Sequence, residues 1–254
     1  MRRVTIPVPD LTLALELDLP SHAHMALDEV LLEAVAAGRR PPLLRFWGWT
    51  EPTLVLGSNQ SFSNEVDQDA AALRGFTITR RLSGGGTMLA EPGRTITWSL
   101  AIPAEPVAGM SFADSFAYLD RWAVEALRGL GVDAGYRPLN DIVSPAGKIA
   151  GAAQARRRGA LLHHVTMAYS MDQQALRELI RVGRPTVTEK GVRSADKVVS
   201  PLDTLLDATR EEVVAALADA SGAVPGRLEQ PELEEAADLV ADKYARREWI
   251  HRLP

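Results

Sequence analysis

The sequence predicts an α/β protein with one large domain and a small C-terminal appendage. Amphipathic helical patterns alternate along the chain with short runs of β-branched and aromatic residues. Glycine and proline separate these runs and mark turns. The 254 residues, 46% of them hydrophobic, suffice to bury one sizeable core. We therefore expect one large domain over residues 1–222 and a short helical appendage over 223–254.

The first part of the chain is predicted to fold as helix, two strands and helix. Residues 22–37 place apolar side chains at helical spacing and end before Gly38, which is typical of an amphipathic helix. Residues 42–49 and 53–60 are aromatic and aliphatic runs joined by the segment TEP, which favours a β-hairpin. A further helix is expected over residues 64–74.

The rest of the chain alternates strands and helices in the same way. The clearest pattern is an amphipathic helix that is followed by glycines. A Pro- and Gly-rich stretch, residues 222–227, is the candidate linker. The expected elements are a strand at 94–103, the helix at 111–131, three strands joined by turns within 142–171, and helices at 171–180, 209–220 and 231–248.

Composition excludes several classes of function. A net charge of −5 and a pI near 5.6 argue against broad electrostatic binding to nucleic acid or to an anionic membrane. No apolar run is long enough to span a bilayer, and no secretory signal begins the chain, so we expect a cytoplasmic protein. The chain has no cysteine, which excludes disulfides, thiolate metal sites and a cysteine thioester intermediate.

A glycine-rich loop follows the strand expected at 76–79. Arg80 and Arg81 precede Ser83 and three consecutive glycines, 84–86. Glycine lacks the Cβ atom that would hold a ligand away from the backbone, so this loop fits close approach of an anionic or amide-bearing ligand to main-chain N–H groups. The alternative is a turn or bulge between neighbouring strands. The spacing matches neither a phosphate-binding Walker loop nor a dinucleotide fingerprint.

A second constellation lies around a lysine with small neighbours. Asn140 and Asp141 begin a strand, and Lys148 follows a Pro-Ala-Gly turn. Residues 151–153 continue the strand almost without side chains. Such a lysine can reach across a pocket and neutralise a carboxylate or a phosphate, although a solvated lysine on a turn is the simpler alternative.

Together these stretches resemble the lipoate-protein ligase family, within the wider group of biotin and lipoate ligases and octanoyltransferases. The matching positions are the Arg-Arg-x-Ser-Gly-Gly-Gly motif at 80–86, Asn140, Asp141, Gly147, Lys148, Gly151, Ala153 and Gln154. Further agreement lies in MALDEVLL, LRFWGWTEPTLVLGSNQ, the paired His163 and His164 before Thr166, VRSADKVVSPL and the tail KYARREW. The resemblance covers about residues 20–200 and that tail.

The resemblance implies a fold of the α+β type, with a mixed sheet flanked by helices. It implies that lipoate and ATP condense to lipoyl-adenylate with loss of pyrophosphate. A lysine of a lipoyl-acceptor domain would then displace AMP to give a lipoyl amide. A separate accessory ligase subunit is a possible second partner; nucleic acid and membrane are not expected partners.

The resemblance also implies roles for individual residues. Lys148 would be the catalytic residue that pairs with the lipoate carboxylate and the α-phosphate. Asp141, with Asn140, would help to place Mg²⁺ and the phosphates. The residues expected to line the substrate and ATP site are Arg81, Ser83, Gly84, Gly85, Gly86, Thr87, Met88, Leu89, Asn140, Asp141, Gly151, Ala153 and Thr166.

Two alternatives remain open beside the ligase. Octanoyltransferases of this fold move an acyl group without ATP, but they hold it on a cysteine, which this chain lacks. A lipoate- or adenylate-binding subunit that works only with a partner is the other alternative. It is motivated by departures from the family pattern, Ala90-Glu91 in place of His-Asp and Val165 in place of glycine. For the histidine pair we expect no metal but opposite orientations on a buried strand.

Overall fold

The structure is a computed structural model that describes residues 4–15, 17–182, 192, 194–195 and 197–253. Its centre is an eight-stranded mixed sheet with the strand order β11-β1-β2-β6-β10-β9-β8-β7. β11 and β2 both run parallel to β1, and the other neighbouring strands are antiparallel. The strands are β1 (Thr12–Ala14), β2 (Leu43–Trp47), β6 (Thr95–Pro103), β7 (Gly135–Arg137), β8 (Asp141–Ser144), β9 (Gly147–Arg157), β10 (Ala160–Ala168) and β11 (Val224–Pro225). The expected mixed sheet and the three consecutive strands after Asn140 are confirmed.

A second sheet carries the glycine-rich loop. It has three strands in the order β4-β3-β5, which are β4 (Thr77–Arg80), β3 (Thr53–Leu56) and β5 (Met88–Ala90). The hairpin predicted for residues 42–49 and 53–60 is wrong, because β2 belongs to the large sheet and β3 to the small one. Every residue of both strands is buried. A continuous apolar run therefore reflects burial on both faces and says little about which strand is the neighbour.

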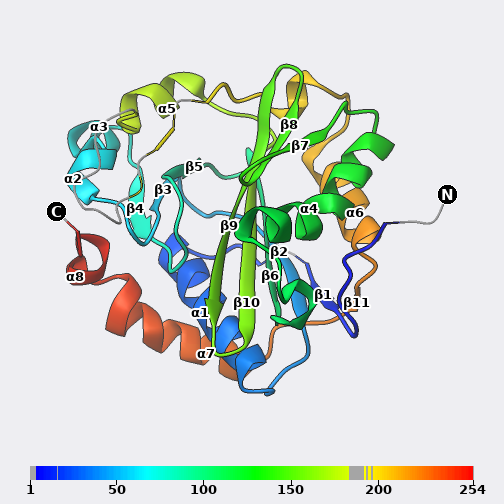
Figure 1. Cartoon of the computed structure of the whole chain (residues 1–254). Helices are drawn as coiled ribbons and strands as arrows, with labels where there is room; N and C mark the ends of the chain where they lie inside the picture. Colours follow the sequence, from blue (N-terminus) through cyan, green and yellow to red (C-terminus); the bar gives the residue numbers. More distant parts are fainter. Residues whose placement is uncertain (1–3, 16, 183–191, 193, 196, 254) are drawn as a thin grey trace.

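Helices cover both faces of the large sheet, as Figure 1 shows. α1 and α7 lie on one face, where side chains of α1 pack with Leu43, Trp47 and Leu162. α4 and α6 lie on the other face, with Leu44, Phe46 and Trp98. The α-helices are α1 (Ser21–Ala36), α2 (Phe62–Glu65), α3 (Gln68–Leu73), α4 (Phe112–Gly129), α5 (Gln173–Leu179), α6 (Arg210–Ser221), α7 (Gln230–Leu239) and α8 (Arg247–Ile250). Strand alternation sends neighbouring residues of β2 to opposite cores.

The helix expected over 64–74 is two short helices. α2 ends at Glu65, and Asp67 begins α3 by accepting a hydrogen bond from the Ala70 N–H. An aspartate cap interrupts the apolar spacing and restarts the helix, which the apolar periodicity alone does not reveal. In α4 the expected start is confirmed, because Ser111 accepts from the Asp114 N–H as N-cap.

The C-terminal segment docks on α1 and β4. α7 packs against α1, and the Tyr244 hydroxyl donates to Glu29 of α1 at 2.6 Å. The Trp249 indole donates to the Arg80 carbonyl at 2.9 Å. The stretch 222–227, predicted from the sequence as a linker, instead contains β11, which pairs with β1 at the edge of the large sheet. The division into domains 1–222 and 223–254 stays a prediction.

None of the helices in the described residues has the length and apolar character that crossing a membrane requires.

Candidate functional site

The glycine loop is built around the Arg81 side chain. Its guanidinium donates to the carbonyls of Val55, Gly84 and Gly86 at 3.1, 2.6 and 2.8 Å. Burial and the neighbouring Arg80 lower the pKa of Arg81 to about 10, so it remains a cation at neutral pH. Arg81 therefore shapes the loop through backbone carbonyls. Its positive charge, more than its N–H donors, is what it offers to a ligand.

Gly57 and the loop residue Gly85 lie backbone against backbone, and each position requires glycine. A Cβ atom on Gly57 would lie 2.0 Å from the Gly85 carbonyl oxygen. Gly85 itself has φ +92°, a left-handed conformation that disfavours any side chain. Gly84 differs from both, because a Cβ atom there would meet no atom of the described residues within 4 Å. The backbone at Gly84 thus borders open space, as a ligand-facing position requires.

We predict that Gly84→Val will leave the fold intact but weaken acyl-donor binding by at least about tenfold. The new side chain would project into space that is open in the protein alone, so any loss should come from ligand crowding. Titration calorimetry and thermal unfolding of the variant measure the two effects separately. Gly85→Val is a poorer test, because its strained backbone conformation would disturb the fold as well. Unchanged affinity in a folded Gly84→Val protein would contradict ligand approach at this position.

The lysine predicted to be catalytic lies in a cluster of charges at the start of β9. The Lys148 ammonium lies 3.0 Å from one carboxylate oxygen of Asp141, and the Lys197 ammonium contacts the other. Burial lowers the pKa of Lys148, which Asp141 raises and Lys197 and Arg81 lower further. One buried carboxylate facing two ammonium groups leaves a local excess of positive charge. Such a site attracts a carboxylate or a phosphate.

Glycine and backbone pairing hold this lysine in place. A Cβ atom on Gly151 would lie 2.3 Å from the Lys148 ammonium nitrogen, so the side chain can fold over β9 only because residue 151 is glycine. The Lys148 N–H donates to the Val198 carbonyl at 2.8 Å, and its carbonyl accepts from the Ser200 N–H at 2.8 Å. The backbone is therefore fixed on both sides of the ammonium group.

The lysine cluster and the glycine loop meet across strand β10. Gly151, which Lys148 covers, pairs with Thr166 of β10. The Thr166 hydroxyl contacts the Met88 sulfur at 2.8 Å, two residues beyond the last glycine of the loop. At this place the positive charge of Arg81 contributes to lowering the pKa of Lys148. The structure thus brings the two sequence motifs together in one region.

The remaining predicted positions surround this region with different contacts. The Thr87 N–H donates to Ser194 Oγ at 3.1 Å, and the Thr87 hydroxyl donates to Gln60 Oε1 at 3.0 Å. Asn140 Nδ2 donates to the Ala152 carbonyl at 2.5 Å, which ties β8 to β9. Leu89 is buried in an apolar cluster with Leu54 and Leu56, and Ala153 is buried in β9 opposite His164. These residues support the walls, and their contact with a ligand stays a prediction.

Behind Ser83 lies a buried row of hydrogen-bonded polar side chains, called the polar chain below, which the sequence patterns did not predict. Ser83 Oγ lies 2.6 Å from His164 Nε2, and His164 Nδ1 lies 2.8 Å from Asp28 of α1. The other oxygen of Asp28 accepts from Arg45 at 2.6 Å. Burial would raise the pKa of Asp28, but Arg45 and His164 together lower it well below its usual range. The chain keeps a carboxylate charged inside the protein.

The paired histidines face opposite sides of β10, as expected. His164 bonds Asp28 on the α1 side, whereas His163 Nε2 lies 2.7 Å from Asp120 of α4. In the described residues no group of three or more histidine or acidic side chains is placed to hold a metal ion. Successive side chains on a strand alternate, which is why the sequence alone predicts the opposite orientations.

We predict that the unfolding free energy falls as pH drops from about 7 to about 5. Burial lowers the pKa of His164 and lowers that of His24 well below 6.5. The unfolded chain then binds protons at a higher pH than the folded one does, so stability is full above about pH 6.5 and is lost toward the lower folded values. Each histidine contributes up to about 1.4 kcal/mol per pH unit. Urea unfolding across this range measures the slope, and His24→Gln should flatten it; an unchanged slope would contradict the assignment to His24.

Asp141 does not fit the expected Mg²⁺ site in its present arrangement. It is a single carboxylate, and each of its oxygens faces an ammonium group, from Lys148 or Lys197. A cation there would have to displace at least one of these ion pairs. Asp141 therefore offers no carboxylate oxygen to a metal ion while both ion pairs are in place.

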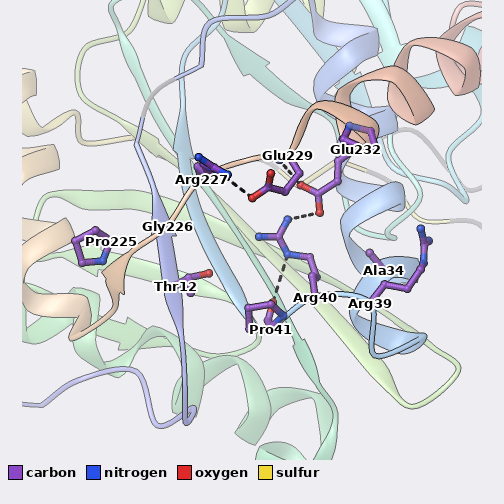
Figure 2. A pocket seen from close by; sticks show the side chains of 11 residues that line it. Thr12, Ala34, Arg39, Arg40, Pro41, Pro225, Gly226, Arg227, Glu229 and Glu232 are labelled. Carbon is purple, nitrogen blue, oxygen red and sulfur yellow. Dashed lines mark hydrogen bonds and ion pairs between the residues drawn. The ribbon is translucent and has the colours of Figure 1, made fainter.

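A separate hollow of about 740 Å³ lies between α1, β11 and α7 and holds none of the predicted site residues (Figure 2). Its cations are paired with glutamates. Arg40 contacts Glu232 at 2.5 Å, and Arg227 contacts Glu229 at 3.0 Å. We assign no site to this hollow.

Comparison with known proteins places the chain in a family. The profile of the lipoyl protein ligase A/B catalytic domain matches residues 20–222. The chain belongs to this family. The octanoyltransferase LipM of Kyrpidia tusciae is 32% identical over 90% of this chain and 94% of its own length. LipM of Macrococcus caseolyticus is 28% identical with the same coverage. These relatives favour the octanoyltransferase alternative over the ligase that the sequence motifs suggested.

Solved structures with the same fold are lipoate-protein ligases. A bipartite lipoate protein ligase from Thermoplasma acidophilum, studied with its E2 lipoyl domain, has a TM-score of 0.79 and 25% identity. A lipoate-protein ligase A bound with ATP has a TM-score of 0.79 and 26% identity. In both comparisons the match covers 96% of this chain and 98% of the other. The protein therefore belongs to an enzyme family that contains both ligases and octanoyltransferases.

Proposed function

We propose that the protein attaches an octanoyl or lipoyl group to a lysine side chain of a lipoyl-acceptor domain, after activation of the free acid by ATP. The acid would attack the α-phosphate, pyrophosphate would leave, and the acceptor amine would then displace AMP. Membership of the lipoyl ligase family supports acyl transfer to lysine. The ATP-bound ligase with the same fold supports the nucleotide.

One observation carries the choice of ATP, namely a strongly cationic site in a chain without any thiol. Lys148 and Lys197 pair with the Asp141 carboxylate, and the charge of Arg81 lowers the pKa of Lys148. Within the described residues, the N–H groups of the three consecutive glycines donate to no protein atom. N–H groups that have no partner among the described residues, together with cations, suit the phosphate and carboxylate of an acyl-adenylate. An enzyme-bound cysteine thioester cannot form, because the chain has no cysteine.

Octanoyl transfer from a thioester donor is the second candidate, and the LipM relatives favour it. In this chain the acceptor lysine would have to attack the donor thioester directly, since no cysteine is present to carry the acyl group. The same Lys148 ammonium could then stabilise the oxyanion that forms on the thioester carbonyl. The partners differ, because this route needs an acyl carrier protein and no nucleotide.

The two routes separate in one assay of the purified chain with a lipoyl domain as acceptor. One reaction contains ATP, Mg²⁺ and octanoate or lipoate, and the other contains octanoyl-acyl carrier protein alone. Mass spectrometry of the acceptor reports acylation, and pyrophosphate release reports activation. ATP-dependent acylation supports the ligase, and acylation from the thioester alone supports the transferase.

A binding role without catalysis would show itself by lipoate binding with no acylation from either donor. Because one ligase with this fold is bipartite, the assay is repeated with the accessory chain of such a system before activity is judged absent. The proposed function would be overturned if neither donor acylates the lipoyl domain, with or without the accessory chain.

A further inference from the structure

Both candidate routes end in the same chemical step. A lysine amine of the acceptor attacks an activated acyl carbonyl, and it can do so only after losing a proton. A lysine ammonium in water has a pKa near about 10.4, so only a small fraction is neutral at physiological pH. A base close to the reacting amine would therefore accelerate the step for either donor.

The polar chain behind the glycine loop has the geometry of a proton acceptor. Asp28 lies 2.8 Å from Nδ1 of His164, and as a carboxylate it can only accept, so Nδ1 carries the proton. The lone pair of Nε2 is then free to accept the hydrogen of Ser83 Oγ at 2.6 Å. This is the tautomer in which an imidazole takes a proton from a hydroxyl.

The surroundings of His164 lower its pKa, so the imidazole is neutral before it accepts a proton. Burial lowers its pKa, Asp28 raises it, and Arg81 and His163 lower it. Arg45, on β2, holds Asp28 from the far side at 2.6 Å. A neutral imidazole next to a permanently charged carboxylate can accept a proton and is then stabilised as imidazolium.

Ser83 connects this pair to the glycine loop. Its hydroxyl accepts from Arg81 Nε at 3.1 Å, and Arg81 also influences Lys148. Among the described residues, no atom lies within 4 Å of a Cβ atom built on the neighbouring residue Gly84, so an unbranched lysine side chain can approach beside it there. The Ser83 end of the polar chain thus lies at the glycine loop, where the acyl group is expected to bind.

We propose that Ser83, His164 and Asp28 form a proton relay that deprotonates the acceptor lysine. This inference rests on the proposed acyl transfer to lysine, and it is independent of the acyl donor. The substrate ammonium gives a proton to Ser83 Oγ, while the Ser83 hydroxyl proton moves to His164 Nε2. The neutral amine nitrogen then forms the bond to the acyl carbon as the bond to AMP or to sulfur breaks, and the nitrogen releases its second proton to water as the amide forms. His164 returns its proton through Ser83 to the leaving group, so the relay is restored.

The test isolates the second half of the reaction. Wild type, Ser83→Ala and His164→Asn are given synthetic octanoyl-adenylate with one of two nucleophiles, the lipoyl domain or hydroxylamine. Hydroxylamine is already neutral near pH 7 and needs no relay. We expect both variants to acylate the lipoyl domain about 100-fold more slowly or worse, with hydroxamate formation close to wild type.

The pH profile gives a second readout that a purely structural role would not move. Wild-type transfer to lysine should level off once His164 is neutral. In the variants the rate should keep rising toward the pKa of a free lysine amine, about 10.4. Ser83→Ala removes only one oxygen atom, so it is the variant with the least effect on folding.

His163→Asn is the matched control. His163 is buried, is bonded to Asp120 at 2.7 Å and lies one residue from His164, but it faces α4 on the other side of the sheet. Its loss should leave the ratio of lysine to hydroxylamine transfer unchanged.

Three outcomes would overturn the relay. If Ser83→Ala and His164→Asn slow transfer to lysine and transfer to hydroxylamine equally, the Ser83–His164–Asp28 relay has only a structural role. If both variants acylate lysine at the wild-type rate, proton transfer does not pass through Ser83 and His164. A wild-type protein that acylates hydroxylamine but not lysine, with either donor, would overturn the proposed function as well.

Discussion

Lys148→Ala should abolish acyl activation, lowering turnover by at least about 10²–10³-fold while the protein stays folded. The ammonium group lies 3.0 Å from Asp141 and directly over Gly151, and under the proposed function negative charge grows beside it in the transition state of either route. The stability cost should be about 1 kcal/mol or less, because this side chain is 26% exposed and Asp141 keeps its contact with Lys197. Pyrophosphate exchange and acceptor acylation measure activity, and thermal unfolding measures stability.

Lys243→Ala is the control for this prediction. Lys243 also pairs with a mostly buried carboxylate, Glu29, and is 21% exposed, but it lies in the C-terminal segment on α1. Its loss should affect stability to a similar extent and leave turnover unchanged. Near-normal turnover of Lys148→Ala would remove the central catalytic assignment, whichever acyl donor is used.

The sequence was most informative where a local pattern had a local cause. The helix expected at 111–131 is α4, because its apolar stripe and the Ser111 cap act within a few turns. The three strands after Asn140 are confirmed because tight turns join them in sequence order. The proximity of Lys148 to the glycine loop was expected from motif resemblance, and the contact between Thr166 and Met88 gives it a physical basis.

Strand neighbours and buried polar partners could not be obtained in this way. β2 and β3 are only six residues apart in sequence yet belong to different sheets, and their apolar runs carry no mark of this. Asp28 and His164 are separated by 136 positions, so only the packing of α1 on β10 brings them together. Lys197 lies in a segment that resembled the family, but the sequence did not indicate that it contacts Asp141.

Arg45→Met should destabilise the protein by about 3–5 kcal/mol, a large effect for one substitution. Arg45 and Asp28 are each 1% exposed, and the guanidinium also donates to the His24 carbonyl at 3.2 Å. Methionine keeps much of the apolar stem but leaves the Asp28 carboxylate in the protein interior with His164 as its remaining partner. Uncompensated burial of one charge, and not the loss of a favourable pair, is the main source of the expected cost. Urea unfolding at neutral pH gives the free energy directly.

The comparison with an exposed pair tests that explanation. Arg39 and Glu235 form a 3.4 Å ion pair with side chains 54% and 48% exposed, so Arg39→Met should cost less than about 1 kcal/mol. In the Arg45→Met protein, moreover, Asp28 should take up a proton at a higher pH than in wild type, since Arg45 is the principal charge that lowers its pKa. The deficit relative to wild type should therefore shrink as pH falls through the range in which that carboxyl is protonated only in the variant. A deficit that is small at neutral pH, or one that does not change with pH, would mean that packing around Arg45 and not the buried carboxylate controls stability here.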